Sequence, residues 1–322
     1  MTLKGLFLCL VFLLCNATSH AADDLITRQV TIKLDKAGTL PDKIGSSKKY
    51  KITNLKIVGE INGTDWRLIC DMASEDDYGR TKGKLSTLDL SDAKIVGGGN
   101  SYINIDGNSY YTSNDKLGNY AFYDCRVLTN LTIPSSVTSI GESAFEYCRG
   151  LTSLTIPSSV TSIGESAFWD CSSLTSLTIP SGVTSIGEAA FSGCSGLTSL
   201  TIPSSVTSIG NYALKGCSGL TSIYVYPEKL PKLGEKVFDG CNAKNCKVYV
   251  PTGTYDDYWL SEFGYFENIV EFDATGIDKV TTSTDAKEVS RYSVNGQRLS
   301  APAKGLNIVK YSDGSVKKVV VL

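Results

Sequence analysis

Apolar and polar residues alternate over short stretches in the middle of the chain. In residues 171–191, CSSLTSLTIPSGVTSIGEAAF, polar residues separate Leu177 from Ile179, which is the period of a strand with one buried face. Pro180 follows directly and has no N–H group with which to continue a strand ladder. The pattern therefore predicts a short strand that ends at this proline.

The second half of the same stretch predicts a turn and a return. Val183 and Ile186 are spaced to point inward, and Gly187 suits a tight bend because it has no Cβ. Residues 188–191 suit a short α-helical or 3₁₀ turn whose last two residues face the core. A unit this small cannot bury its apolar face alone, whereas stacked units can cover one another.

The same unit recurs at a fixed period of 23 residues. The cysteines keep this step, with the last one residue late: Cys125, Cys148, Cys171, Cys194, Cys217 and Cys241. Prolines and glycines keep it as well: Pro134, Pro157, Pro180 and Pro203, then Gly141, Gly164, Gly187 and Gly210. Such a period is the signature of a solenoid. We therefore predict an α/β repeat solenoid of leucine-rich repeats, in which short strands alternate with short helical turns.

Both ends of the repeated region depart from the unit and are predicted to be caps. Residues 22–84 form the predicted N-terminal cap, with a strand followed by a helix that begins near Asn62 or Thr64. Residues 85–272 form the predicted solenoid together with its C-terminal cap. Aromatic residues are expected to cover the last open repeat: Tyr255, Tyr258, Trp259, Phe263 and Phe266.

The N-terminal segment 1–21 has the features of a signal peptide. Lys4 precedes the apolar run LFLCLVFLL at 6–14, and the small residues around His20 fit a cleavage site. The run is too short to span a bilayer. Cys15 leaves lipidation of the chain open as an alternative. Either reading predicts export from the cytoplasm.

The composition changes again after the solenoid. Residues 273–290 are polar and are predicted to form a linker. Residues 291–322 are predicted to form a small all-β module, because Asn295 and Gly296 are a strong hairpin-turn pair between two short strands. Two further strands are expected within 306–322.

The repeat unit resembles the leucine-rich repeats of BspA-like surface proteins of Gram-negative gut and oral bacteria. The resemblance runs from about residue 85 to residue 272, and ITNLKIVGEINGTDW, at 52–66, resembles the N-terminal caps of that family. It implies a right-handed solenoid and a role in adhesion, with host matrix proteins and other bacteria as partners. Because the shared residues are scaffold positions, the resemblance assigns no functional residue.

The C-terminal stretch YSVNGQRLSAPAKGLNIVKYSDGSVKKVVV, at 292–321, resembles the sorting modules of type IX secretion. This resemblance implies recognition by that secretion machinery, passage through the outer membrane and attachment at the cell surface. Whether the module is then removed stays open. The alternative is a β cap that remains on the protein.

Charge and histidine content limit the chemistry. The net charge is −2, which gives no reason to expect nucleic acid as a partner. The only histidine, His20, lies in the predicted signal peptide, so the mature chain has no histidine for a nucleophile pair or a mixed zinc site. Chemistry by carboxylates alone is not excluded by this argument. We predict a protein that is not an enzyme and has no cofactor and no metal site.

Two sets of residues are candidates for ligand contacts. The first is a polar ladder predicted to point outward from the strands: Ser153, Thr155, Ser176, Thr178, Ser199 and Thr201. The second set is aromatic: Tyr102, Tyr110, Tyr111, Tyr224 and Tyr226. The first three of these tyrosines lie in a long insertion, where functional loops often occur. Trp169 is expected to be exposed on a helical turn.

The remaining conspicuous residues have structural explanations. The repeated cysteines are predicted to be inert core residues, although Cys241 and Cys246 are close enough in sequence for a possible disulfide in an oxidising compartment. The repeated glutamates are expected at the N-termini of short helices: Glu142, Glu165 and Glu188. The NIDGN stretch at 104–108 is predicted to be a polar turn rather than a calcium loop, because it has one carboxylate.

The function predicted from these features is binding at the bacterial surface. We expect a secreted or outer-membrane-associated protein that adheres to a host extracellular protein or to another cell. Two alternatives remain: a protein that captures a polysaccharide, and an envelope scaffold without a specific ligand.

Overall fold

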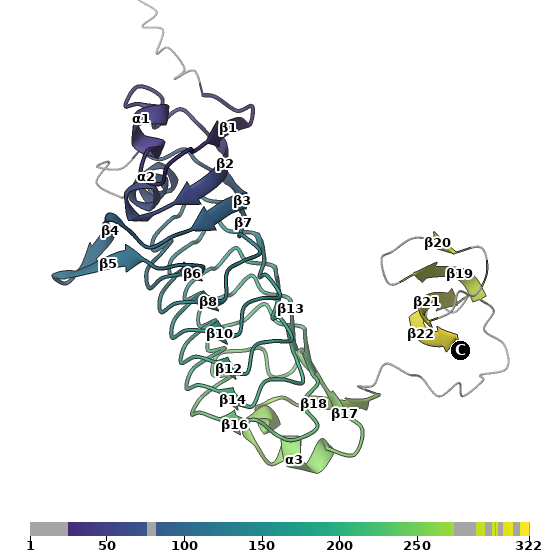
Figure 1. Cartoon of the computed structure of the whole chain (residues 1–322). Helices are drawn as coiled ribbons and strands as arrows, with labels where there is room; N and C mark the ends of the chain where they lie inside the picture. The colour runs from purple at the N-terminus through teal and green to yellow at the C-terminus, as the bar shows by residue number, and fades with distance from the viewer. Residues whose placement is uncertain are drawn as a thin grey trace, which may run out of the picture.

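The computed structural model describes residues 25–75, 82–273, 288–293, 298–299, 301, 305–311 and 316–321, and it shows an elongated stack of repeats (Figure 1). The predicted signal peptide with Cys15, and most of the predicted linker, lie outside the described residues.

Each repeat contributes one strand to each of two parallel sheets. The larger sheet has ten strands in the order β1-β2-β3-β7-β9-β11-β13-β15-β17-β18. They are β1 (Val30–Lys33), β2 (Asn54–Ile61), β3 (Thr87–Ile95), β7 (Asn130–Thr132), β9 (Ser153–Thr155), β11 (Ser176–Thr178), β13 (Ser199–Ile202), β15 (Ser222–Val225), β17 (Lys247–Pro251) and β18 (Asn268–Phe272). The strand predicted from the 171–191 pattern is β11, and it ends before Pro180 as expected.

The second sheet was not predicted from the sequence. Its six strands have the order β16-β14-β12-β10-β8-β6. They are β6 (Lys116–Leu117), β8 (Ser139–Ile140), β10 (Ser162–Ile163), β12 (Ser185–Ile186), β14 (Ser208–Ile209) and β16 (Lys232–Leu233). Two residues are too short a run to show a strand period, so only pairing with neighbouring repeats reveals these strands.

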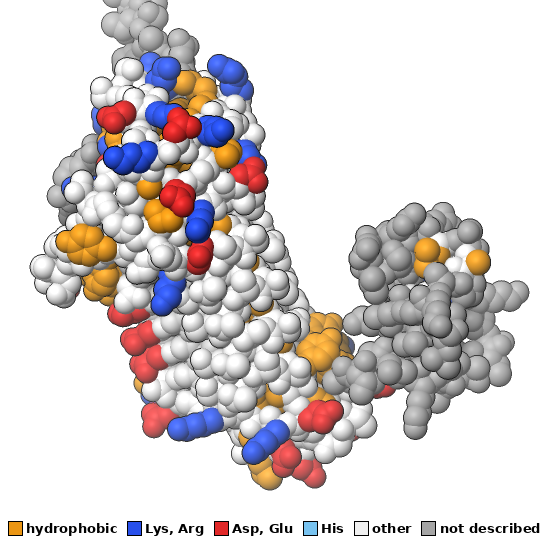
Figure 2. Space-filling view, viewed as in Figure 1, with side chains coloured by type: hydrophobic (Ala, Val, Ile, Leu, Met, Phe, Trp, Pro, Cys, Tyr) orange, Lys and Arg blue, Asp and Glu red, His pale blue; other side chains and the backbone are white. Residues whose placement is uncertain are grey.

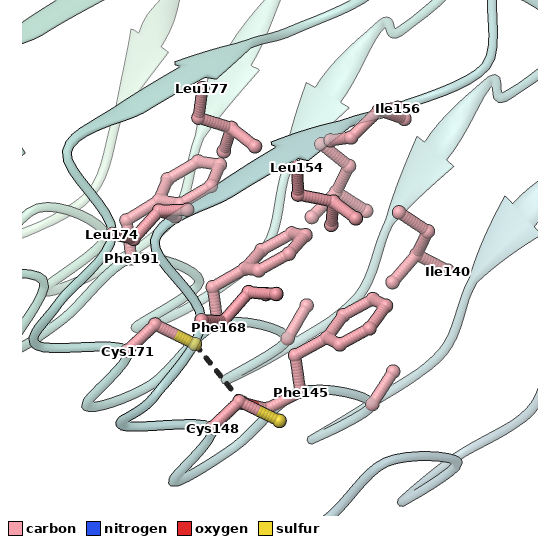
Figure 3. Close-up of a cluster of buried hydrophobic side chains, with 14 of the residues drawn as sticks. Ile140, Phe145, Cys148, Leu154, Ile156, Phe168, Cys171, Leu174, Leu177 and Phe191 are labelled. Carbon is pink, nitrogen blue, oxygen red and sulfur yellow. Dashed lines mark hydrogen bonds between the residues drawn. The ribbon is translucent and has the colours of Figure 1, made fainter. Parts of the chain in front are cut away.

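The core lies between the two sheets and the turns that connect them. In-register leucines of the larger sheet, such as Leu154 and Leu177, point inward together. Beneath them the rings of Phe122, Phe145, Phe168 and Phe191 stack nearly parallel, with successive centroids 5.3, 5.0 and 5.4 Å apart. Figure 3 shows Phe145, Phe168 and Phe191 of this column beside the side chains of Cys148 and Cys171. Every repeat therefore buries its apolar face against the next one.

The N-terminal end of the column is closed by two helices, α1 (Leu40–Ile44) and α2 (Gly63–Ala73). Asn62 is the N-cap of α2, and its side chain forms a reciprocal capping box with Asp65. From α2 the Trp66 ring packs against Phe122 at a centroid distance of 5.1 Å, and its Nε1 donates a hydrogen bond to the Ala121 carbonyl. An indole at this place covers the first ring of the column and satisfies a backbone acceptor.

The C-terminal end is closed by α3 (Tyr255–Trp259) and a 3₁₀ turn, η1 (Glu262–Tyr265). Phe263 and Phe266 pack against Phe238, and Tyr258 is fully buried beside them. The other two aromatic residues expected in this cap, Tyr255 and Trp259, are exposed instead and stack on each other.

The connecting turns are not helical, and the prediction of short helical turns is therefore wrong. None of the residues 118–241, all of which are described, is in an α- or 3₁₀-helix. Alternate N–H groups reach the next repeat, as when Ser166 N bonds Glu188 O and Phe168 N bonds Ala190 O, both at 2.8 Å. Left-handed residues, such as Ser166 with φ 51° and Asp170 with φ 55°, give the turn this geometry.

The repeated glycines have a different role from the predicted tight bend. A Cβ on Gly187 would lie 2.5 Å from the carbonyl carbon and oxygen of Gly164 in the preceding repeat, although φ of Gly187 is ordinary. Gly164 and Gly210 meet their preceding repeats at similarly short distances. These glycines are therefore required by the close approach of successive backbones.

The insertion predicted as a loop is a hairpin. Its strands β4 (Gly98–Ile105) and β5 (Asn108–Thr112) pair antiparallel, with Asp106 and Gly107 both at positive φ in the turn. An Asp-Gly pair between two strands is a common hairpin signal, so this element was accessible from the sequence and was missed.

The C-terminal module is a four-stranded antiparallel sheet in the order β20-β19-β21-β22. Its strands are β19 (Glu288–Ser293), β20 (Arg298–Leu299), β21 (Gly305–Tyr311) and β22 (Val316–Val321). The predicted Asn295-Gly296 turn lies outside the described residues, although the strands on either side of it pair as a hairpin requires.

Replacing Gly187 by alanine is expected to destabilise the solenoid by about 3 kcal/mol, because the new methyl group meets backbone atoms that have no room to move. The matched control is Gly182→Ser. The neighbouring repeats carry Ser159 and Ser205 at that position, and their hydroxyls donate to Val137 O and Val183 O. Urea unfolding followed by circular dichroism would contradict the close-approach argument if both variants unfold like the parent chain.

Replacing Ala189 by glycine is expected to stabilise the protein by about 0.5–1 kcal/mol. Ala189 has φ 48°, and in this left-handed conformation its Cβ causes a steric strain that glycine does not have. The control is Ala190→Gly, next in the chain, where φ is not positive and the methyl group is fully buried. Unfolding midpoints should shift in opposite directions for the two variants. A loss of stability in Ala189→Gly would show that this turn conformation is wrong.

Candidate binding surface

The strand face carries the predicted polar ladder. Ser153, Ser176 and Ser199 are in register on neighbouring strands, as are Thr155, Thr178 and Thr201, and all six are exposed or half-buried. The threonine that precedes each of these serines has a structural role instead, since Thr175 Oγ1 donates to Thr152 O at 3.1 Å. The outward ladder is thus a surface of hydroxyl groups without charge.

Aromatic residues replace this ladder at its C-terminal end. Tyr224 continues the Thr201 position in register, and its ring stacks on Tyr249 at 4.6 Å and 6°. Phe272 packs edge-on against Tyr224, Tyr226 and Tyr249. Tyr224 and Tyr226 were predicted contacts, and the structure adds Tyr249 and Phe272 beside them. All four rings are half-buried, because they shield one another.

The β4–β5 hairpin separates its three tyrosines. Tyr102 is buried, with its Oη donating to Asn119 O at 2.6 Å, and burial raises its pKa. The prediction of Tyr102 as a ligand contact is therefore wrong, because its ring packs between the hairpin and the solenoid. Tyr111 is 57% exposed at the outer face of the hairpin, whereas Tyr110 turns back toward the first repeat.

Five rings form a continuous series from the hairpin along the turns of the first three repeats. This series, which we call the aromatic row, consists of Tyr110, Tyr120, Tyr123, Tyr147 and Trp169. Its successive ring centroids are 4.9, 5.7, 5.8 and 5.9 Å apart. Its last member, Trp169, is 41% exposed, and the expectation that this residue lies at the surface is confirmed. Three of its members, Tyr120, Tyr123 and Tyr147, were not identified from the sequence.

Carboxylates alternate with these rings. The two positions before successive cysteines read Tyr123-Asp124, Glu146-Tyr147 and Trp169-Asp170, so each of these three rings has acidic neighbours along the chain and in the adjacent repeat. Glu142 accepts hydrogen bonds from Tyr120 Oη at 3.2 Å and Asn119 Nδ2 at 3.3 Å. The predicted role of Glu142, Glu165 and Glu188 at helix N-termini is wrong, because no helix begins there.

The electrostatic surroundings shift the pKa values in the row upward. Burial, and then the nearby Glu142 carboxylate, raise the pKa of Tyr120 to about 12. Burial and then Glu146 raise the pKa of Tyr123. The pKa of Glu146 is itself raised, chiefly by burial, since the residue is 7% exposed. Each of these shifts comes from carboxylates and rings that are held close together with little solvent.

The row is confined to one end of the solenoid. At the two positions before the cysteine, the fourth and fifth repeats carry Ser192-Gly193 and Lys215-Gly216 instead. An alignment of the repeats on their cysteines would therefore have revealed the row. It places rings and carboxylates of the first three repeats at positions where the fourth repeat has small residues. In Figure 2 acidic side chains follow one another down the edge of the solenoid below the hairpin, while much of the remaining visible surface has few charges.

The cysteines form a buried column of hydrogen-bond donors. Cys171 Sγ donates to Phe145 O at 3.1 Å (Figure 3), and Cys148, Cys194 and Cys217 make the equivalent bond in their own repeats. Cys241 does likewise to Leu214 O, so the predicted Cys241–Cys246 disulfide is wrong for this structure, in which both are free thiols. Burial raises the pKa of Cys241 to about 12 and of Cys246 to about 11.

Two negative findings concern the described residues only. Within them, no group of three or more histidine, cysteine, aspartate or glutamate side chains is placed to hold a metal ion. No helix in the same part of the chain has the length and apolar character needed to cross a membrane. In the NIDGN turn, Asn104 Oδ1 accepts from Gly107 N and its Nδ2 bonds Ser109 Oγ, as a polar turn requires.

The stacked parallel strands, the 23-residue period and the leucine core define a leucine-rich-repeat solenoid. Residues 115–247 match the family model described as the BspA type leucine rich repeat region, in six copies. The repeats over residues 115–247 are therefore similar to those of the BspA type. A comparison with curated proteins gave no match.

Solved structures of other repeat proteins are similar to this chain. A leucine rich repeat protein of T. pallidum (TpLRR) is 28% identical over 45% of this chain and 70% of its own, with a TM-score of 0.34. The pneumococcal vaccine antigen PcpA is 17% identical over 71% and 61%, with a TM-score of 0.39. A leucine rich cell surface protein of Faecalibacterium prausnitzii A2-165 is 17% identical over 70% and 65%, with a TM-score of 0.31. The chain thus spans less than two thirds of the last two proteins.

The burial of the cysteines predicts a slow reaction of the native protein with a thiol reagent. The eight cysteines of the described residues should react with DTNB slowly at mildly alkaline pH, because burial excludes the reagent and raises the pKa values of thiols such as Cys171, Cys241 and Cys246. Unfolding in denaturant without reductant should release all eight thiols of the mature chain. Two fewer thiols, restored by reductant, would show a disulfide.

Proposed function

We propose that this protein is a secreted binding protein displayed at the bacterial surface, and that the aromatic row is its principal contact surface. The observation that carries the proposal is the placement of five neighbouring rings beside the hairpin in an otherwise hydroxyl-rich repeat surface. Aromatic side chains dominate binding energy in protein interfaces, whereas serine and threonine contribute little. The Ser/Thr ladder then serves as the rim or the neutral remainder of the surface.

Surface display is supported by several features together. The predicted signal peptide provides export, and one structural relative is described as a cell surface protein and another as a vaccine antigen. The four-stranded C-terminal module agrees with a sorting module of type IX secretion, which would deliver the chain across the outer membrane. Within this proposal, strands β19–β22 contact the secretion machinery and the solenoid contacts the ligand.

The proposed partner is a host extracellular protein or a surface protein of another cell. Such a partner can cover the hairpin and the first three repeats at once, since the row follows the long axis of the solenoid. No catalytic role is part of the proposal.

Polysaccharide capture is the second candidate function, and one observation favours it. Tyr255 and Trp259 at the C-terminal cap are 39% and 44% exposed, and their rings are parallel within 7° at a centroid distance of 6.1 Å. Exposed, nearly parallel rings offer the apolar platform on which the faces of sugar rings can lie. This platform is separate from the aromatic row, so the two functions can be tested independently.

The test uses the mature chain in biolayer interferometry against fibronectin, fibrinogen, collagen, laminin, mucin and a set of polysaccharides at physiological salt. Saturable binding to a protein is expected, and Trp169→Ser should weaken it about thirtyfold, the loss typical of a central aromatic contact. Serine is the residue that the next repeat carries at this position, so the fold should be unaffected.

Tyr224→Thr is the matched control, because Thr201 occupies the same position one repeat earlier, outside the aromatic row. Protein binding that survives Trp169→Ser but is lost in Tyr224→Thr would move the site to the strand face. Binding to polysaccharides alone, abolished by Trp259→Ala, would favour glycan capture. No binding to any of these ligands would favour an envelope scaffold.

A further inference from the structure

Glu146 occupies an unusual place in the aromatic row. Its side chain lies one repeat below Tyr123 and one repeat above Trp169, next in sequence to Tyr147. It is 7% exposed, and the interactions that shift its pKa are burial, a hydrogen bond from Ser143 and repulsion by Glu142. Among the described residues no lysine or arginine forms an ion pair with Glu146. The hydrogen bond from Ser143 offsets part of the cost of burying this carboxylate, and a cationic ligand would offset more of it.

The arginines of the neighbouring turns already have partners. Arg126 Nε bonds Asp124, and Arg149 Nε bonds Asp170 Oδ2 at 2.8 Å in the following repeat. Among the described residues of these turns, the five carboxylates Asp124, Glu142, Glu146, Glu165 and Asp170 outnumber the two arginines, which leaves a net charge of −3. The row therefore has an uncompensated negative charge of its own, although the whole chain has a net charge of only −2.

The rings of the row suit a cation better than a sugar. Successive rings from Tyr120 to Trp169 meet at 69°, 74° and 34°, so they form no flat platform for a sugar ring. A cation needs only the face of a single ring, within about 6 Å of its centroid, so tilted rings can each bind one. The chain itself uses one of them in this way, since the Arg149 guanidinium lies 5.3 Å from the centroid of Tyr147.

We propose that the aromatic row is a recognition site for lysine or arginine side chains in a basic segment of a partner protein, with Glu146 as the carboxylate that receives the cation. The segment lies along the turns of the first three repeats, with Tyr123, Tyr147 and Trp169 as the rings around its basic side chains. This inference rests on the proposed function, because it names the chemistry of the ligand at the same surface.

The experiment measures binding of the mature chain to an immobilised lysine-serine repeat peptide, to the same peptide with its lysines acetylated, and to a glutamate-serine peptide. The lysine peptide is expected to bind saturably, and the acetylated peptide about tenfold more weakly, because acetylation removes the charge but keeps the chain. Binding should also weaken as salt is raised.

Two variants test the site by independent changes. Glu146→Gln keeps the shape of the side chain and removes its charge, and it should weaken lysine-peptide binding about tenfold. The double variant Tyr147→Gly and Trp169→Ser should weaken it at least as much. Tyr147 has φ 60°, which glycine adopts without strain, and the fourth repeat carries Gly193 and Ser192 at the positions of Tyr147 and Trp169. Circular dichroism confirms that each variant is folded.

Glu188→Gln is the control, since Glu188 belongs to the same acidic series but lies against Asn211, away from the rings. Its affinity for the lysine peptide should match that of the parent chain. Equal binding of acetylated and unmodified peptides, or equal weakening by Glu188→Gln and Glu146→Gln, would overturn the inference. Failure to bind the lysine peptide together with Trp169-dependent binding to a matrix protein would overturn it while leaving the proposed function standing, and failure in both assays would remove both.

Discussion

No repeat of this protein is complete until the next one lies against it. The backbone N–H and C=O groups of each unit pair with neighbouring units in both sheets and in the turns, and its leucine and phenylalanine side chains are buried only by the adjacent repeat. The stack therefore requires a close and constant distance between successive backbones, about 4.8 Å where strands pair. That single spacing accounts for the other regularities of the fold.

Each repeated residue type meets one demand of this spacing. Gly164 and Gly187 stand where a Cβ would collide with the preceding repeat. Cys171 fits the core as a small apolar residue whose thiol still bonds a carbonyl, and Thr175 satisfies another carbonyl from the surface side. At the ends of the stack no further repeat covers the core. There Trp66 packs over the first phenylalanine ring, and Phe263 and Phe266 pack against the last one.

The fold does not require particular side chains at some positions of the turns, and these positions carry the aromatic and acidic residues. In the turns, the two residues before each cysteine are small in the fourth repeat and are ring-bearing or acidic in the first three. Small residues in the fourth repeat show that the fold does not need these side chains. Their concentration beside the β4–β5 hairpin instead creates one acidic, aromatic surface on an otherwise neutral rod, which is why the binding proposals centre there.

The sequence by itself determined the repeat, its period, the strands of the larger sheet, the inward-facing residues and the capped helix that begins after Asn62. These features follow from local periodicity and from residues with strong conformational preferences, such as Pro180.

The tertiary structure decided the rest. Left-handed residues such as Ser166 turn alternate N–H groups toward the next repeat, so the turns are not helical. Tyr102 is buried because the hairpin folds against the first repeat. The aromatic row exists only because Tyr123, Tyr147 and Trp169, one repeat apart in the chain, are brought within 6 Å of one another. Contacts between residues so distant in sequence depend on how the repeats stack, and this geometry cannot be predicted from local sequence patterns.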